Sequence, residues 1–198
     1  TLFRSGMTPA AAFAQQMPNG QWRFRSEVVT ERAGVITFAK LVKDHIAAFY
    51  PGFKIYRVTG DPAGNQGQIG DKDNRSVFQL LAAEGIEAEP AHTNEPTIRR
   101  EALAKPMRAL IDGEPGFLVH PDCKTFRKGL AGGFCYKRVQ VTGDAKYRDQ
   151  PDKNIYSHVC ESAEYLMMGA GEGKAIVRRE PNRNRAAYAI SDYAILGD

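Results

Sequence analysis

Asp61 is the first residue whose type and setting could do chemistry. It follows an apolar, alternating run and opens a loop rich in Pro and Gly at residues 60–64. Ligand sites in α/β proteins gather where strands end, so a carboxylate at this place is a candidate metal ligand. Asp is also a favoured turn residue, and an Asx turn that caps the loop explains the position equally well. A second carboxylate is needed to choose between the two interpretations.

A later segment, residues 154–168, supplies that second carboxylate. Its pattern predicts a helix on which His158 and Glu161 lie three residues apart and therefore share a face, with Tyr165 four residues further along the same stripe. An acid on the buried face of a helix is unusual unless it is paired or binds metal. We expect Glu164 to point elsewhere and to be solvated. For His158 alone, a half-buried histidine held by a hydrogen bond is the simpler interpretation.

The elements that must position these residues follow from hydrophobic spacing and turn signals. Two runs, residues 9–16 and 21–29, flank the turn residues Pro18, Asn19 and Gly20 and predict a β-hairpin. Further strands are expected at residues 53–59, 86–89, 117–120 and 134–141, and helices at residues 34–49, 76–83, 96–111, 124–130 and 154–168. A hairpin followed by alternating strands and helices predicts an α/β fold, a mixed β-sheet flanked by helices on both faces.

The composition is that of one ordinary domain with a sizeable core. The chain has 198 residues, of which 42% are hydrophobic and 25% charged. No apolar run is long enough for a membrane helix or a signal peptide, so a cytoplasmic compartment is the default expectation. The formal net charge of +4 favours polyanionic partners without requiring them.

The cysteines argue against two further classes of protein. Cys123, Cys135 and Cys160 are odd in number and have no C-x-x-C spacing. A disulfide framework and a structural zinc site are therefore both disfavoured. We expect free, mostly buried thiols.

Five motifs occur in order along nearly the whole chain, from about Gly6 to Gly171. They are Gly6-x-Thr8-Pro9-Ala10; Gly60-Asp61-Pro62-Ala63-Gly64; Pro90-Ala91-x-Thr93-Asn94 followed by Arg99 or Arg100; Gly129-Leu130-x-Gly132-Gly133-Phe134-x-Tyr136-Lys137; and Lys153-Asn154-x-x-Ser157-His158 before Glu161, Tyr165 and Leu166. Together they resemble the C-terminal nuclease domain of the large terminase subunit of tailed bacteriophages. The chain contains no G-x-x-x-x-G-K-[ST] loop, so no ATPase half is visible.

The resemblance implies that residues 1–173 form a ribonuclease H-like nuclease domain. Such a domain cuts concatemeric double-stranded DNA with divalent metal, here Mg²⁺ or Mn²⁺, and the resemblance implies two ions. In this family three acids hold the metal, and here they correspond to an unfilled position on the first strand, to Asp61 and to Glu161. His158 is then expected to orient the site or its water. Hard oxygen ligands are what two cations about 3.5–4 Å apart require, because one activates a water and the other stabilises the leaving oxygen.

The chain departs from the family pattern at two of these positions. Glu161 stands where the family usually has Asp, and residues 1–5 contain no carboxylate, so that Phe3 or Arg4 occupies the place of the first acid. An arginine there would bring a positive charge toward the metal and lower its affinity. Other acids could substitute for the first one: Glu27 on the neighbouring hairpin strand, and Asp71 or Asp73 in the loop after Asp61. For each of them, a solvated surface acid remains the simpler interpretation.

Basic residues cluster around the motifs, as a surface that follows DNA phosphates would require. Lys137 and Lys153 are the strongest candidates because they fall inside family motifs, and Arg138 and Arg75 come next. The resemblance also implies a terminase ATPase domain, a small terminase subunit and a portal as partners, in the cytoplasm of an infected bacterial host and without a membrane. The basic C-terminal tail, residues 174–198, is expected to pack on the domain or to contact DNA or the portal.

Two alternatives stay open from the sequence. The missing first-strand acid also fits a catalytically impaired terminase domain that docks to DNA or to the portal without cutting. A different ribonuclease H-like nuclease, such as a Holliday-junction resolvase or a transposase core, is a weaker third hypothesis.

Overall fold

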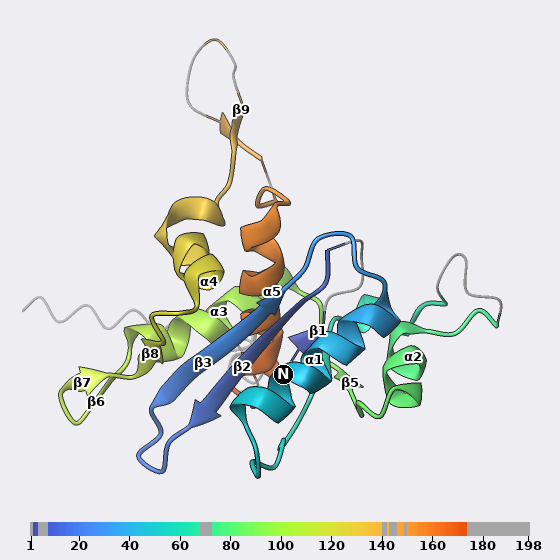
Figure 1. Ribbon diagram of the computed structural model, residues 1–198. Coiled ribbons are helices and arrows are strands. Elements are labelled where there is room, and N and C mark those ends of the chain that lie inside the picture. The colour runs from blue at the N-terminus through green and yellow to red at the C-terminus, as the bar shows by residue number, and fades with distance from the viewer. Residues whose placement is uncertain are drawn as a thin grey trace, which may run out of the picture.

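Two small sheets lie at the centre of the computed structural model, which describes residues 2–3, 8–67, 73–139, 142, 146–148 and 150–173 (Figure 1). In the larger sheet, β2 (Ala10–Gln16) pairs antiparallel with β3 (Trp22–Val29), and β3 pairs in parallel with β8 (Phe117–Val119). The predicted hairpin is therefore present. Its turn includes Gly20 with a φ of 92°, a backbone conformation that glycine adopts without steric cost.

The second sheet is short and entirely parallel. It contains β1 (Leu2–Phe3), β4 (Thr59–Gly60) and β5 (Glu89–Pro90) in the order β1-β4-β5, with Leu2 opposite Thr59 and Phe3 opposite Gly60. β1 also contacts β2, so β1 and β2 are the facing edges of the two sheets. The molecule is accordingly a mixed α/β protein with parallel and antiparallel pairs.

The described part of the chain forms five α-helices beside these sheets (Figure 1). Their bounds are α1 (Val35–Phe49), α2 (Val77–Ala83), α3 (Pro96–Arg108), α4 (Lys124–Lys128) and α5 (Ile155–Gly169). Two begin with a reciprocal capping box, in which the first side chain bonds the third backbone N–H and the third side chain bonds back: Ser76 with Gln79 in α2, and Asn154 with Ser157 in α5. These caps satisfy N–H groups that a helix start leaves without a partner.

Alternate residues of β2 pack into two separate clusters. Ala10 and Ala12 belong to a cluster with residues of α3, α4 and α5, whereas Ala11 and Phe13 belong to one with residues of α1 and α2. This alternation is the period of two that a strand imposes on its side chains. All four residues are at most 4% exposed, so the small alanines let helices approach the strand closely.

Several predicted elements differ in extent. Only Thr59–Gly60 of the expected strand 53–59 pairs as a strand, and the expected helix 96–111 ends at Arg108 because Leu110–Ile111 (β6) pairs with Glu114–Pro115 (β7). The Asp112–Gly113 turn between them has positive φ at both residues, a hairpin geometry that Asp-Gly favours. Of the expected strand 86–89, Glu89 lies in the two-residue β5 (Glu89–Pro90). Of the expected strand 134–141, residues 140 and 141 lie outside the described residues, and among residues 134–139 Arg138–Val139 (β9) pairs with Lys146–Tyr147 (β10).

The cysteine prediction is confirmed for all three residues, since each is free and Cys123 and Cys160 are buried. None of the helices in the described part of the chain is long and apolar enough to cross a lipid bilayer.

Candidate active site

Asp61 follows β4 directly and caps the loop, which is one of the two interpretations of its sequence position. Its Oδ1 accepts a hydrogen bond of 2.9 Å from the backbone N–H of Ala63, which caps the 3₁₀ turn η1 (Pro62–Asn65). The same carboxylate lines a pocket of about 260 Å³. One oxygen thus fixes the loop while the side chain also faces the pocket.

The pocket brings together three acids from two distant parts of the sequence. Glu161 and Glu164 of α5 line it together with Asp61. The two glutamates are 3% and 1% exposed. The expectation that Glu164 is solvated is therefore wrong. α5 is enclosed by β2, α3 and α4, and every residue from Val159 to Met168 is buried, so no face of this stretch is left for a solvated acid.

Three cations line the same pocket and balance these acids. They are Arg99 and Arg100 of α3 and Lys153, which precedes the cap of α5. The ammonium of Lys153 forms a close ion pair with Oε1 of Glu161. Lys153 is half exposed at the pocket rim, whereas the Glu161 side chain is almost fully buried. The charge on Glu161 is therefore stabilised by a lysine that solvent and anionic ligands can reach.

Arg99 organises the inner part of the pocket. Its Nε lies 3.7 Å from Oε2 of Glu164, and its guanidinium carbon lies 4.6 Å from the centre of the Tyr165 ring. The Tyr165 hydroxyl donates a close hydrogen bond to Oδ1 of Asn94. Burial raises the pKa of Tyr165 well above its ordinary value despite the nearby Arg99 charge, so the hydroxyl stays protonated as a donor.

His158 lies outside the set of residues that line this pocket. Its Nε2 is 2.6 Å from Oγ1 of Thr8, and the side chain is half-buried. Because Thr8 lies just before β2, this contact ties the start of α5 to the hairpin. The geometry matches the simpler interpretation of His158 as a histidine held by a hydrogen bond, and its role toward Asp61 and Glu161 stays a prediction.

The three suggested substitute acids are placed differently from one another. Both oxygens of Glu27 accept hydrogen bonds from the start of α4, from the backbone N–H of Thr125 at 2.7 Å and of Phe126 at 2.8 Å. Asp73 is exposed and lies 3.7 Å from Nε of Arg75. Asp71 lies outside the described residues. Neither Glu27 nor Asp73 lines the pocket of Asp61 and Glu161.

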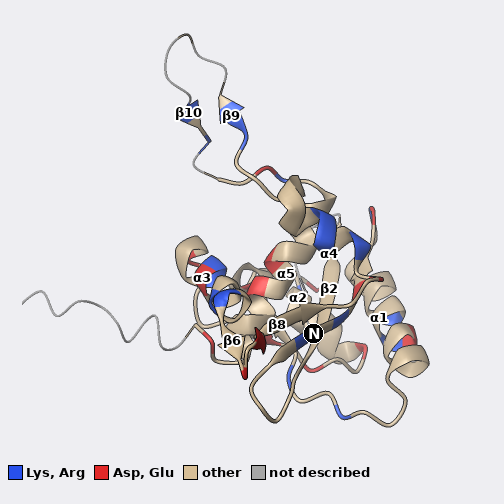
Figure 2. Ribbon diagram, turned by 90° about the vertical axis from the view of Figure 1, so that its left-hand side faces the viewer, with Lys and Arg blue, Asp and Glu red and all other residues tan. Residues whose placement is uncertain are grey.

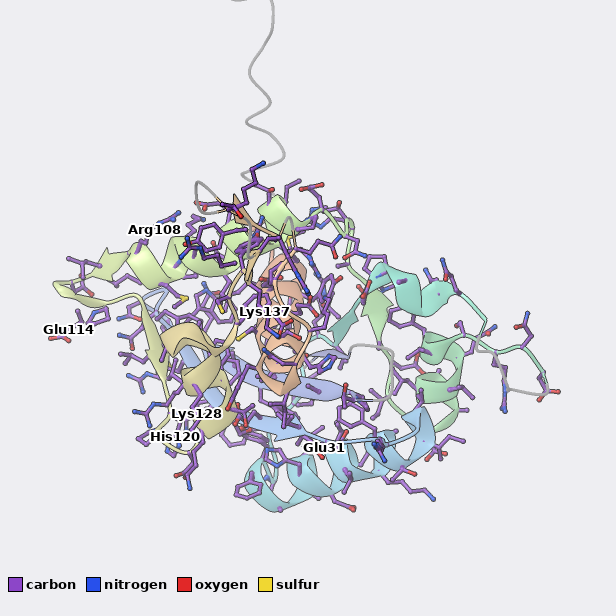
Figure 3. The ribbon with its side chains drawn as sticks, turned by 90° about the horizontal axis from the view of Figure 1, so that it is seen from above. Glu31, Arg108, Glu114, His120, Lys128 and Lys137 are labelled. Atoms are coloured by element: carbon purple, nitrogen blue, oxygen red, sulfur yellow. The ribbon has the colours of Figure 1, made fainter. Side chains whose placement is uncertain are left out.

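The expected DNA-contacting cations belong to different parts of the molecule, since Lys137, Arg138 and Lys153 lie near β9 and the start of α5 and Arg75 lies before α2. Figure 2 shows basic residues on α4, β9 and β10, and Figure 3 shows Lys137 over α5 with Lys128 on the neighbouring α4. Lys137 binds Oδ2 of Asp152 at 2.7 Å, and this hydrogen bond and charge hold the pKa of Asp152 below its usual value. Arg138 is exposed on β9. Arg75, beside Asp73, belongs to the segment that leads into α2.

The side chains that line the pocket are partly suited to hold a divalent cation. Its carboxylate oxygens are the ligand type that Mg²⁺ and Mn²⁺ prefer. Within the residues that the structure describes, no three His, Cys, Asp or Glu side chains are grouped closely enough to hold a metal ion. The donor type therefore fits such an ion through Asp61 and Glu161, and Lys153 competes with it for Glu161.

Three pocket residues, Glu164, Asn94 and Arg99, were not predicted to line the site, although the sequence contains signals for them. Glu164 is three residues from Glu161, a spacing that places both on one helical face, and its burial shows that this face turns inward. Asn94 and Arg99 stand in the third of the five motifs, and neither was predicted to contact Tyr165. Their shared contact is Tyr165, the residue already expected on the stripe of Glu161.

Comparison with known proteins gives one structural likeness. No protein-family model and no curated protein matches the sequence. The fold is similar to the crystal structure of the g2p (large terminase) nuclease domain from the bacteriophage SPP1 with bound Mn. That protein is a phage nuclease domain. The likeness covers 83% of this chain and 81% of that one, at 10% sequence identity and a TM-score of 0.49. The neighbour belongs to the family that the sequence motifs resemble. At this identity and score the chemistry must be argued from the pocket's own residues.

Proposed function

We propose that this chain is a nuclease domain of the phage terminase type, with a ribonuclease H-like sheet covered by helices on both faces, that cleaves double-stranded DNA with a divalent cation. The observation that carries the proposal is the meeting of Asp61 and Glu161 in one pocket, although they are far apart in the sequence. The packing of β2 into one cluster with α5 and another with α1 supports the two helical layers.

Each pocket residue then has a definite task. Asp61 and Glu161 would hold the cation, which when bound supplies Lewis-acid stabilisation of charge on phosphate oxygens. Asp61 is already oriented by its bond to the Ala63 N–H, so little freedom is lost on binding. Lys153, at the rim, is placed to exchange Glu161 for a DNA phosphate, which would release the carboxylate when substrate arrives. Arg99 and Tyr165 keep Glu164 and Asn94 fixed beneath them.

The test is cleavage of a supercoiled plasmid with Mn²⁺, Mg²⁺ or EDTA, using the wild-type chain and Asp61→Asn. Asparagine keeps the oxygen that caps η1 but loses the charge, so the loop should stay folded. We expect metal-dependent nicking to fall on the order of 100-fold or more, because ligand loss should cost at least as much as loss of a supporting contact. Asp73→Asn, an exposed acid outside the pocket, is the matched control and should cut normally. Equal cutting by Asp61→Asn would remove Asp61 from the site.

A second function is favoured by the ion pairs inside the pocket. Lys153 and Arg99 each neutralise one of the acids, and no carboxylate stands at the first-strand position in residues 1–5. A domain that binds DNA or a portal without cutting would keep this arrangement. Such a module should bind DNA in EDTA and show no thermal stabilisation by Mn²⁺, whereas a metal site stabilises the fold once the ion exceeds its Kd.

The remaining expectations belong to this proposal. They are two Mg²⁺ or Mn²⁺ ions, contact with a terminase ATPase domain, small subunit and portal, and action in the cytoplasm of an infected bacterium. Among the proposed DNA contacts, Arg138 on the exposed β9 and Lys137 beside it are the residues best placed for phosphate binding.

A further inference from the structure

The pocket of Asp61 and Glu161, called the Asp61 pocket below, contains aromatic side chains that its acids and cations do not require. Phe134 and Tyr136 line it together with those acids and Lys153. Carboxylates suit a metal ion and a lysine suits a phosphate, but neither ligand needs the face of an aromatic ring. A nucleic acid also carries planar bases, and their faces stack on aromatic side chains. The two rings therefore indicate a part of the ligand that the proposed function leaves unexplained.

The segment that carries Tyr136 is held in place by backbone hydrogen bonds on both sides of this residue. The carbonyl oxygen of Cys135 accepts from the N–H of Asp152 at 3.0 Å, and that of Lys137 accepts from the N–H of Arg148 at 2.9 Å. Tyr136 is half-buried between these two exposed neighbours, and Lys137 lies over α5 (Figure 3). The ring of Tyr136 thus has a fixed place at the open side of the pocket.

Phe134 and Tyr136 differ in how much of each ring a ligand can reach. Phe134 packs against the larger core cluster. The glycine before it lets the chain pass close to α5, because a Cβ at Gly133 would lie 2.7 Å from the Tyr156 ring. Neither cluster of the described residues includes Tyr136. Phe134 is therefore the anchor of the segment, and Tyr136 presents the ring that a ligand can cover.

Two consecutive arginines each lie over a tyrosine ring, but the two pairs are held differently. The guanidinium carbon of Arg99 is 4.6 Å from the centre of the Tyr165 ring, and its Nε is 3.7 Å from Glu164. The guanidinium carbon of Arg100 is 5.4 Å from the centre of the Tyr136 ring, and no carboxylate in the described part of the chain pairs with it. The inner pair is fixed by an acid, whereas the outer pair depends on the ring contact.

The outer pair, Arg100 with Tyr136, can exchange its contact for those of a nucleotide. A cation over a ring at a partly exposed site is held weakly, because water solvates the cation. A base stacked on the same ring is held more strongly. The guanidinium that it displaces has a planar fork that matches two oxygens of a phosphate. Ring and guanidinium therefore match the base and the phosphate of one nucleotide.

We propose that Tyr136 stacks on an unpaired base of the bound DNA and that Arg100 binds the phosphate beside that base. The inference rests on the proposed function, because it takes DNA as the ligand of the Asp61 pocket. Neighbouring bases cover both faces of a base inside a duplex, so Tyr136 can stack only on one that has left the helix. Taking a base out of the helix costs least where it is already unpaired. The pocket should therefore prefer DNA with unpaired nucleotides to fully paired DNA.

The experiment compares two labelled duplexes of equal length in EDTA, one fully paired and one with a central bubble that contains 2-aminopurine. In fluorescence anisotropy the wild-type chain should bind the bubble duplex about tenfold more tightly. The 2-aminopurine emission should fall on binding, because stacking on a tyrosine ring quenches it. Tyr136→Leu should remove both effects, whereas Tyr136→Phe keeps the ring face and should retain them.

Tyr56→Leu is the matched control, because Tyr56 is 92% exposed and does not line the Asp61 pocket. It should behave as the wild type. All three variants should keep the wild-type thermal midpoint, since neither tyrosine belongs to a core cluster of the described residues.

Two results would overturn the proposal. One is equal binding of both duplexes by the wild type. The other is a loss of affinity in Tyr136→Leu that is the same for both duplexes, which would make the ring only a support for Arg100.

Cutting of the same duplexes with Mn²⁺ separates this inference from the proposed function. Bubble preference and quenching without any cutting would support the stacking site and overturn the nuclease. Cutting of both duplexes at equal rates, without quenching, would support the nuclease and overturn the stacking site.

Discussion

Lys153 determines the electrostatic state of the Asp61 pocket. Glu161 is buried and carries its charge in contact with this lysine, while Lys153 itself is half exposed. A cation that binds Glu161 must displace the ammonium, and a phosphate that binds the ammonium must detach it from Glu161. Under the proposed function, the same ion pair would stabilise the metal-free protein and would oppose metal binding, and the two effects can be measured separately.

Replacing Lys153 with Gln should lower stability and strengthen metal binding. Loss of this ion pair weakens the stabilisation of a buried carboxylate, and the exposure of Lys153 limits the cost to about 1 kcal/mol of unfolding free energy. With the competitor gone, the rise in thermal midpoint caused by Mn²⁺ should exceed that of the wild type. Differential scanning fluorimetry with and without Mn²⁺ measures both effects.

Lys146→Gln provides the matched control for this variant, because Lys146 is exposed on β10 and does not line the pocket. It should change neither the midpoint nor the response to Mn²⁺. A variant at Lys153 that loses stability without any gain in Mn²⁺ response would show that the lysine is structural and that Glu161 takes no metal.

At the scale of elements, Glu27 joins the hairpin to α4. α4 has only five residues, and its first N–H groups are bound by the Glu27 carboxylate on β3. Directly after them, Phe126 is fully buried with its ring centre 4.1 Å from that of Phe24. The acid therefore holds a short helix in the position where its aromatic side chain completes the core.

Glu27→Gln should lower the free energy of unfolding by about 1 kcal/mol, since an amide retains only one of the two accepting oxygens. Chemical denaturation measures this loss. Glu31→Gln, at an exposed acid near the end of the hairpin, should have no effect. The midpoint shift caused by Mn²⁺ should be the same in both variants and in the wild type. A smaller shift in Glu27→Gln alone would make Glu27 a metal ligand after all.

The elements best predicted from the sequence are those with a strong local signal. The hairpin around Gly20 and the helices that became α1, α2 and α5 were predicted closely because their spacing, turn and cap residues agree. Residues 53–59 alternate as a strand but pair only at Thr59 and Gly60, because a strand needs a neighbour that local sequence does not provide. The Asp112–Gly113 hairpin was overlooked inside a helical pattern.

Residue types, helical spacing and the family resemblance predicted Asp61 and Glu161 as parts of one site, and their role as metal ligands stays a prediction. Asp61 and Glu161 were expected to meet, and they line one pocket. The partners of those acids, Lys153 on Glu161 and Arg99 on Glu164, depend on how α3 and the segment before α5 pack together. Glu164 points inward because β2, α3 and α4 enclose α5. This enclosure cannot be read from the type or spacing of Glu164 itself.

At the scale of the whole molecule, the larger core cluster isolates two of the three thiols. Cys123 and Cys160 are fully buried in it, and Cys135 is exposed. Burial is the main cause that raises the pKa of both buried thiols to about 12. Native protein at pH 8 should therefore react with a maleimide once, at Cys135, and unfolded protein three times. Mass spectrometry counts the adducts, and Cys135→Ser should abolish the native one. Two or three fast native adducts would mean that the core opens readily.

The same two thiols make stability depend on pH in a definite direction. Above the ordinary thiol pKa of 9.0, the unfolded chain loses these protons while the native protein keeps them up to about 12. The native state then binds more protons than the unfolded state, so the free energy of unfolding must fall as pH rises through this window. Urea denaturation at pH 8 and pH 10 measures the loss. Cys160→Ala should make the loss smaller, because one of the two buried protons is gone, whereas Cys135→Ser should leave it as in the wild type. An unchanged loss in Cys160→Ala would attribute the alkaline weakening to other groups.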